Sequence, residues 1–455
     1  MNVSPGRPLA LFERALYGDG LWPGNVGVTA CIDGAIAHAA LQRALALAQA
    51  RHPLLRCLVV ERQGRPWFEL QDTPPPIPLR VLERHGEEDW VALSAQELQR
   101  CFDGRREPLA RLLWLRGEAR SELVLVCHHA ICDGRALSHL LGELLHWCEA
   151  PERSVQTRHA LPSFSELLPA IVRTDPGLQR SIRWRAAALS LALRWLVRDR
   201  PAQHYGAIYR ELWTLDEAAT RRLSELCRAQ RVSAYVAISL AFVLAFRSVC
   251  GPRRIQRFVA PVDMRSLVAS IGAGDLFGIA PTVELRPGKT DAGTAAPAAF
   301  WERTRALQAD LQDKIEALPP KVYRNFLGLE RLHHVFERMV VYARSRREGR
   351  QLTLSNLGRL SLAQDYRGFH LRAVRGISGV VGATPAHQVV ISRYAGRYDF
   401  ALASDEESLP RAQAQRIREH AMELLLALTA EQPQPGTAAT SAPASSVPAA
   451  SVSPA

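Results

Sequence analysis

Two adjacent histidines, His128 and His129, open the segment HHAICDG, which closes with Asp133 and Gly134. An apolar run precedes this segment and a run with helical periodicity follows it, so we expect a loop between a strand and a helix. Neighbouring residues of a strand point to opposite faces, and only one of the two imidazoles can face a given cleft. An imidazole held there exchanges protons near neutral pH, so the segment predicts general acid or base catalysis.

The same residues also have a purely structural interpretation. One histidine could pack in the core and the other face solvent, while Asp133 caps the next helix and Gly134 supplies a turn. The four fixed letters of HHxxxDG occur by chance in roughly one in a thousand chains of this length and ordinary composition. The combination of pattern and position therefore favours the catalytic interpretation.

Metal binding and thiol chemistry are two further alternatives. Cys127, Cys132 and Asp133 are potential zinc ligands beside the histidines, but strand alternation divides these side chains between two faces. No second ligand cluster at zinc-finger spacing completes a four-coordinate site, so we expect no bound metal. Either cysteine could act as a nucleophile. The eight cysteines include no CxxC pair, which predicts separate, reduced thiols.

The composition indicates a globular protein with a basic surface. Of the 455 residues, 47% are apolar and 22% are charged, and the formal net charge of +12 favours an anionic partner. We expect no nucleic acid, because no zinc-finger, aromatic RNA-binding or dense lysine segment occurs. The most apolar run, Val232 to Phe246, is shorter than the ~18 to 20 residues of a membrane-spanning helix. The chain also opens without a signal-peptide core, and we therefore expect a cytoplasmic protein.

Length and element pattern predict two lobes of α/β type. A chain of 455 residues exceeds what one hydrophobic core usually serves. We expect a first lobe at 1–170 that carries HHAICDG, a basic amphipathic linker at 171–205, a second lobe at 206–431 and a disordered Pro/Ala/Ser tail at 432–455. The patterns predict strands at 26–32, 54–61, 67–70, 112–115, 122–127, 255–260, 282–285, 351–354, 370–374, 388–394 and 397–403, and helices at 36–48, from 135, at 216–228, 233–246, 298–315 and up to 428.

HHAICDG resembles the HHxxxDG signature of the chloramphenicol acetyltransferase-like superfamily, which includes peptide-synthetase condensation domains, alcohol acetyltransferases and polyketide-associated acyltransferases. ARHPLLRCLV at 50–59, PLARLLWL at 108–115 and PVDMRS at 261–266 are similar to other segments of that superfamily and follow its order. FWERTRALQADL at 300–311 and LSNLGRL at 354–360 are similar to the free-standing alcohol-acetyltransferase and polyketide-associated branch. The chain departs from the plant branch, which has a DFGWG segment, and from wax-ester synthases, which have SNVPGP.

The resemblance implies a fold and a set of site residues. The fold would be α/β (α+β), with two related lobes, mixed sheets flanked by helices and an active-site tunnel between the lobes. His129 would be the base that takes a proton from the acceptor, and His128 would be structural. Asp133 would pair with an arginine, for which Arg265 in PVDMRS is the candidate, and Gly134 would leave room for the donor.

Two residues of the second lobe, Ser355 and Asn356, are candidate hydrogen-bond donors near the developing oxyanion. An interpretation as turn residues before Gly358 is equally consistent with the sequence.

The activity that the resemblance implies is transfer of an acyl group from a thioester to an alcohol. Amide formation, as in a free-standing condensation enzyme, and a catalytically inactive condensation-like binding module are the alternatives. No carrier domain accompanies the lobes, so the co-substrate would be acyl-CoA or an acidic acyl carrier protein, with no permanently bound cofactor. We expect a monomer.

The linker contains a strongly amphipathic stretch at 178–197. One helical face carries only apolar residues, a separate stripe carries arginines, and two tryptophans lie beside that stripe. This predicts an interfacial helix near the tunnel mouth that contacts the inner face of the membrane, although a helix packed on a lobe has the same pattern. The apolar face comprises Leu178, Ile182, Ala186, Leu189, Leu193 and Leu196, the basic stripe comprises Arg180, Arg183, Arg194 and Arg198, and the tryptophans are Trp184 and Trp195.

Overall fold

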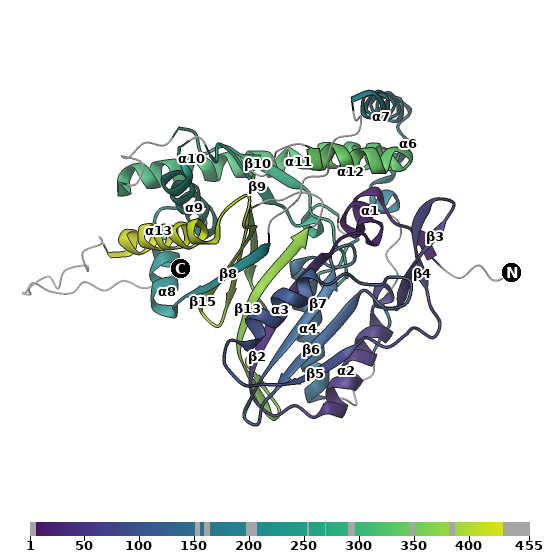
Figure 1. Cartoon of the computed structure of the whole chain (residues 1–455). Coiled ribbons are helices and arrows are strands. Elements are labelled where there is room, and N and C mark those ends of the chain that lie inside the picture. Colours follow the sequence, from purple (N-terminus) through teal and green to yellow (C-terminus); the bar gives the residue numbers. More distant parts are fainter. Residues whose placement is uncertain are drawn as a thin grey trace, which may run out of the picture.

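The chain folds into two α/β lobes, each built on a six-stranded mixed sheet, with a three-stranded sheet at one side (Figure 1). The predicted two-lobed architecture is confirmed. The predicted tail at 432–455 and the end of the linker, with Arg198, lie outside the described residues. The computed structural model describes residues 6–150, 155–158, 164–196, 207–252, 254–268, 270–289, 296–345, 351–381 and 387–430.

The first lobe places the motif segment at the end of a buried central strand. Its sheet has the order β12-β13-β2-β7-β6-β5, and α4 begins directly after the loop that follows β7. Gly27 in β2 allows α3 to pack closely, since a Cβ atom there would lie 3.0 Å from Leu98. The elements of this lobe are β1 (Gly6–Pro8), α1 (Leu11–Tyr17), β2 (Gly24–Gly34), α2 (His38–Arg51), β3 (Cys57–Arg62), β4 (Arg65–Leu70), β5 (Leu79–Glu83), α3 (Asp89–Gln99), β6 (Ala110–Arg116), β7 (Arg120–His128) and α4 (Gly134–Glu149).

The second lobe has the sheet order β10-β9-β11-β14-β15-β8. Its apolar helix α9 is buried along most of its length. The predicted helix starts are confirmed, because the side chains of Asp216 and Ser233 accept hydrogen bonds from the backbone N–H groups of Ala219 and Val236. The elements are β8 (Ile208–Leu215), α8 (Glu217–Ala229), α9 (Ala234–Cys250), β9 (Phe258–Pro261), β10 (Thr282–Leu285), α10 (Pro297–Glu316), β11 (Leu352–Arg359), β14 (His387–Tyr394), β15 (Arg397–Asp405) and α13 (Arg411–Ala430).

One segment from the second half of the chain belongs to the sheet of the first lobe. Strands β12 (Asp365–Tyr366) and β13 (Phe369–Val381) leave the second lobe after β11, and β13 pairs antiparallel with β2. A single lobe boundary at residue 206 therefore does not describe the fold. The strand predicted at 370–374 exists, but its length and its partner depend on a contact far away in the sequence.

A group of helices lies at the top of the molecule in Figure 1, where α7, α11 and α12 are neighbours. The amphipathic stretch of the linker forms α7, as predicted, whereas the pattern analysis missed α1, α3, α11 and α12. No helix among the described residues is long and apolar enough to cross a membrane by itself. Helices α8 and α9 together have sufficient length and apolar composition, but they are bent by 105°. The helices that lie between the two lobes in the chain, or at the top of the molecule, are α5 (Phe164–Leu167), α6 (Ala170–Thr174), α7 (Pro176–Leu196), α11 (Leu318–Leu329) and α12 (Phe336–Ser345).

Candidate active site

The loop between β7 and α4 is held by backbone hydrogen bonds. The N–H of His128 donates to the carbonyl of Leu109 at 2.9 Å, and the N–H of His129 donates to the carbonyl of Gly24 at 2.5 Å. Asp133 caps α4 by accepting a 2.7 Å hydrogen bond from the N–H of Ala136. The motif therefore lies between strand and helix, with both of its ends fixed.

His128 is directed into the interior of the first lobe. Its side chain is buried, and its Nδ1 accepts a hydrogen bond of 3.1 Å from the N–H of Ala130. The ring contacts Tyr17, with 5.4 Å between ring centroids, and Phe102, with 6.1 Å. Burial, with smaller contributions from His129 and Arg111, lowers the pKa of His128 to about 3. A ring that stays neutral and packs between aromatic side chains supports the loop and does not reach the cavity between the lobes.

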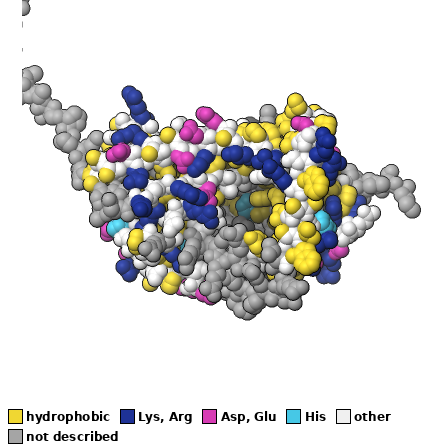
Figure 2. Space-filling model, turned by 90° about the horizontal axis from the view of Figure 1, so that it is seen from above, with side chains coloured by type: hydrophobic (Ala, Val, Ile, Leu, Met, Phe, Trp, Pro, Cys, Tyr) yellow, Lys and Arg dark blue, Asp and Glu magenta, His cyan; other side chains and the backbone are white. Residues whose placement is uncertain are grey.

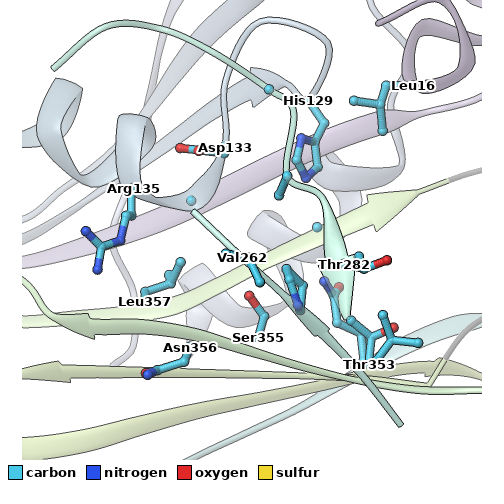
Figure 3. A pocket seen from close by; sticks show the side chains of 18 of the residues that line it. Leu16, His129, Asp133, Arg135, Val262, Thr282, Thr353, Ser355, Asn356 and Leu357 are labelled. Carbon is cyan, nitrogen blue, oxygen red and sulfur yellow. The ribbon is translucent and has the colours of Figure 1, made fainter. Parts of the chain in front are cut away.

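His129 lines a cavity of about 450 Å³ to which both lobes contribute. Figure 3 shows its imidazole pointing into this space, toward Val262 of the second lobe. Burial lowers the pKa of His129, while the Asp133 carboxylate and backbone groups of His129 and Gly278 oppose that effect. Its Nδ1 is buried, so Nε2 is the ring nitrogen that a substrate can reach. A neutral imidazole with an accessible nitrogen is suited to accept a proton.

Asp133 points away from the imidazole (Figure 3) and forms an ion pair across the lobes. Its Oδ2 lies 2.7 Å from Nη1 of Arg265, the arginine chosen from the sequence, and the side chains are only 14% and 9% exposed. Burial alone would lower the pKa of Arg265, but Asp133 and Asp263 raise it. Arg265 also donates to the carbonyls of Gly272 and Asp275. The cap of α4 and the ion pair coexist, so the structural and the functional interpretations of Asp133 both apply.

The second lobe touches the motif loop through Phe277 and Gly278, which the sequence analysis missed. The N–H of Asp133 donates to the carbonyl of Phe277 at 2.9 Å. A Cβ atom at Gly278 would lie 1.8 Å from the carbonyl oxygen of His129, so any side chain there would displace the loop. A lone glycine in a loop carries no periodic pattern, and only its position in space shows its importance.

Strand β11 forms the opposite wall of the cavity. Ser355 and Asn356 both line it, and Figure 3 shows the Ser355 hydroxyl pointing into the cavity while Asn356 is turned away from His129. The Asn356 Oδ1 accepts a hydrogen bond of 3.0 Å from the N–H of Gly358 at a bulge in β11. The two residues lie in a strand and not in the alternative turn. Leu357 packs on Gly134, where a Cβ atom would lie 2.8 Å from a Leu357 methyl group.

The comparisons with known proteins agree with this geometry. The model of the condensation domain matches residues 25–256, which is more than half of the 455 residues. The chain belongs to the condensation-domain family.

Three proteins resemble this chain, one in sequence and two in fold. Cyclosporin synthetase from Tolypocladium inflatum is 29% identical over 227 residues, which are 47% of this chain but 1% of that protein. Trichothecene 15-O-acetyltransferase from Fusarium sporotrichioides shares the fold with a TM-score of 0.66 and 12% identity, covering 93% of this chain and 95% of that one. The first condensation domain of the calcium-dependent antibiotic synthetase has a TM-score of 0.65 and 16% identity, covering 94% and 97%.

These structural neighbours share the chloramphenicol acetyltransferase-like fold, as the resemblance implied. Together with the family model they support a transferase that moves acyl groups.

A second cavity of this condensation domain has a volume of about 580 Å³ and shares the lining residues Arg135 and Leu357 with the first. Burial lowers the pKa of His139, one of its lining residues. The second cavity is lined by one carboxylate, Glu143, and by six basic side chains. The basic side chains are those of Arg51, Arg135, His139, His146, Arg265 and Arg359.

The cysteines of the motif segment do not line either cavity. Cys127 and Cys132 are both fully buried, and burial raises the pKa of Cys132 well above that of a free thiol. A thiol held in its neutral form is a weak nucleophile, which argues against the cysteine alternative. All eight cysteines are free. In the part of the chain that the structure describes, no three His, Cys, Asp or Glu side chains are grouped to hold a metal ion.

Proposed function

We propose that the protein transfers an acyl group from a thioester to an alcohol and so forms an ester, with His129 as the general base. The observation that carries the proposal is the His129 imidazole, which projects into a cavity between the lobes with a lowered pKa. A base must be unprotonated before the reaction begins, and a lowered pKa keeps the ring in that state at neutral pH.

The reaction follows from this position. The Nε2 of His129 accepts the hydroxyl proton as the acceptor oxygen attacks the thioester carbonyl, and a tetrahedral oxyanion forms. When the oxyanion collapses, the carbon–sulfur bond breaks and the imidazolium returns its proton to the leaving thiolate. The products are an ester and a free thiol, and the base is regenerated. General base catalysis of this kind contributes about 10²- to 10⁴-fold to the rate.

Ser355 is the proposed donor to the oxyanion. Its hydroxyl points into the cavity from β11, and a hydroxyl that is already oriented stabilises negative charge as it develops. The side chain of Asn356 holds the bulge of β11 through Gly358, so we assign it to the shape of this wall.

The second cavity supports a donor that carries phosphate, either coenzyme A or the phosphopantetheine arm of a carrier protein. Arg135 belongs to both cavities, and Arg359 lines the second one. Guanidinium groups bind phosphate oxygens with paired hydrogen bonds. In this arrangement the donor thiol reaches His129 past Gly134 and Leu357.

Amide formation is the second candidate. The similarity to cyclosporin synthetase and to a condensation domain favours it, whereas the similarity to a 15-O-acetyltransferase favours the ester. The chemistry at His129 is the same for both, because an amine also loses a proton when it attacks the carbonyl.

The test is thiol release from acyl-CoAs and acyl carrier proteins in the presence of pooled alcohols or pooled amines, with the products identified by mass spectrometry. We expect thiol release that depends on an alcohol, and an acid limb of kcat/KM below pH 6.5, the ordinary histidine value. Release that depends only on amines would replace the ester by the amide.

His129→Ala and His128→Ala form a matched pair for the same assay. We expect His129→Ala to lower kcat/KM by about 10²- to 10⁴-fold with an unchanged melting temperature, and His128→Ala to act mainly by lowering the melting temperature. If His129→Ala kept most of the wild-type activity, the assignment of the base would be wrong.

A further inference from the structure

Helix α7 exposes an apolar stripe on its outer face. Trp184, Leu191 and Trp195 are 78%, 58% and 69% exposed, and Ala188 completes the spacing i, i+4, i+7, i+11 that places four side chains on one face of a helix. The stripe is about 16 Å long at 1.5 Å per residue. Two indoles this exposed on one helix face are unusual for a surface that only meets water.

The opposite face of α7 is the one that packs on the protein. Ile182, Ala186 and Leu193 are buried, and the last two share a cluster with Leu332 and Phe336. The prediction that this face contacts the membrane is therefore wrong for these three residues, because they pack on α11 and α12. The outward apolar stripe was obscured in the sequence, since it contains an alanine and is flanked by arginines.

The charge around the stripe has one sign. Arg180, Arg183, Arg185 and Arg194 are exposed, and none of them forms a salt bridge within the described part of the chain. No aspartate or glutamate occurs between residues 176 and 196. A convex helix with exposed indoles and unpaired guanidinium groups matches the boundary between lipid headgroups and acyl chains, where phosphates and apolar chains meet.

We propose that the outer face of α7 docks on an anionic lipid surface, with Trp184, Leu191 and Trp195 in the interface and the four arginines on lipid phosphates. Figure 2 views the molecule from this side and shows hydrophobic and Lys/Arg side chains together over α7, next to a hollow.

Docking would bring the active-site cavity near the lipid. Leu11 of α1 belongs to the cluster beneath α7, and the next residue, Phe12, lines the cavity together with Leu16 of the same helix. Only one short helix therefore separates the docked face from the cavity wall. This step rests on the proposed function, and it implies that one substrate is an amphiphile drawn from the bilayer.

The test is co-sedimentation of the purified full-length chain with vesicles of phosphatidylcholine alone or with 30% phosphatidylglycerol, at low salt. We expect at least about ten-fold stronger binding to the anionic vesicles, reduced in high salt. Changing Arg180, Arg183, Arg185 and Arg194 together to Gln should abolish the preference, and Trp184→Gln with Trp195→Gln should weaken binding to both vesicle types.

A charge-matched control lies on the other lobe. Arg221, Arg222, Arg228 and Arg231 are exposed on or just after α8, and changing all four to Gln removes the same charge far from α7. Equal loss of binding in the two variants, or negligible wild-type binding to anionic vesicles, would refute the docking site. If the wild-type chain formed dimers without lipid and the tryptophan variant were monomeric, the stripe would instead bind a second copy of the chain. Turnover of a water-soluble short acyl donor and acceptor should remain unchanged in all variants.

Discussion

Two of the polar contacts between the lobes treat buried charge differently. Beside the active site, Asp133 and Arg265 face each other across the lobes at 2.7 Å. At the other contact, Arg210 of β8 reaches the first lobe and donates to Ser94 and Ser378, with no carboxylate partner among the residues that the structure describes. Burial lowers the pKa of Arg210 to about 10. In the first contact, the charge of Arg265 is balanced by the carboxylate of Asp133. In the second, the charge of Arg210 is balanced by the dipoles of neutral hydroxyl groups.

Asp399 belongs to the second type of contact. Its Oδ1 accepts a hydrogen bond of 3.0 Å from the N–H of Gly376 in β13, and its Oδ2 has no partner among the described residues. Burial raises the pKa of Asp399 to about 7, against weaker opposing contributions from Gly376 and Arg375. The comparison teaches that one lobe contact pairs two opposite charges, whereas the other holds a carboxyl whose pKa lies near neutrality.

The largest effect should come from breaking the ion pair. Asp133→Asn and Arg265→Gln should each destabilise the protein, by about 3 to 5 kcal/mol for the loss of one buried partner. Arg265→Gln should cost more, because it also removes hydrogen bonds to Gly272 and Asp275. Denaturant unfolding of the single and double variants measures the coupling. Additive effects of the two changes would show that the pair does not join the lobes.

The glycine that contacts the motif loop provides the next test. Gly278→Ala should push the loop away from its position, because the new Cβ would lie 1.8 Å from the His129 carbonyl oxygen, and should cost about 1 to 3 kcal/mol together with a loss of activity. Gly328→Ala in α11 is the matched control, with its nearest atom at 4.0 Å. Unchanged kcat/KM in Gly278→Ala would show that the second lobe does not set the position of His129.

Asp399→Asn should change stability in a way that depends on pH. Because the pKa of Asp399 is raised to about 7 in the folded protein, from 3.8, its protonation contributes stability that is complete below the unfolded value and lost as the pH rises through 7. Asparagine is neutral throughout, so the variant should be more stable than wild type above pH 7, by up to about 4 kcal/mol. Melting temperatures between pH 5 and 9 measure this, and a difference independent of pH would contradict it.

The smallest effect is expected for Arg210→Met. The change removes an unpaired buried charge, and its partners keep other acceptors, since Ser94 also donates to Val91 and Ser378 to Gly376. We expect a change within about 1 kcal/mol, neutral or stabilising. A loss as large as that of Arg265→Gln would mean that the two contacts do not differ as described.

The part of the site that is contiguous in the sequence could be predicted, and the part assembled from distant segments could not. His129, Asp133 and Gly134 stand within one loop, and Arg265 was found through the resemblance of PVDMRS. Phe277 and Gly278 act through backbone atoms, which leave no mark in the pattern of side chains.

The same limit applies to the fold. The hairpin of β14 and β15 was predicted because both strands and their turn are adjacent. The partner of β13 was not, since β2 lies more than 300 residues earlier. Short helices such as α1 were also not predicted, because a segment of seven residues shows too little periodicity to distinguish a helix from a loop.

The crossing of β13 also has a consequence for the order in which the chain can mature on the ribosome. Until residue 381 has been synthesised, the first lobe cannot complete its sheet, and β2 remains an open edge along ten positions that later pair with β13. Such an edge can pair with other nascent chains. The first lobe, although it is made first, therefore finishes folding only after most of the second lobe has emerged.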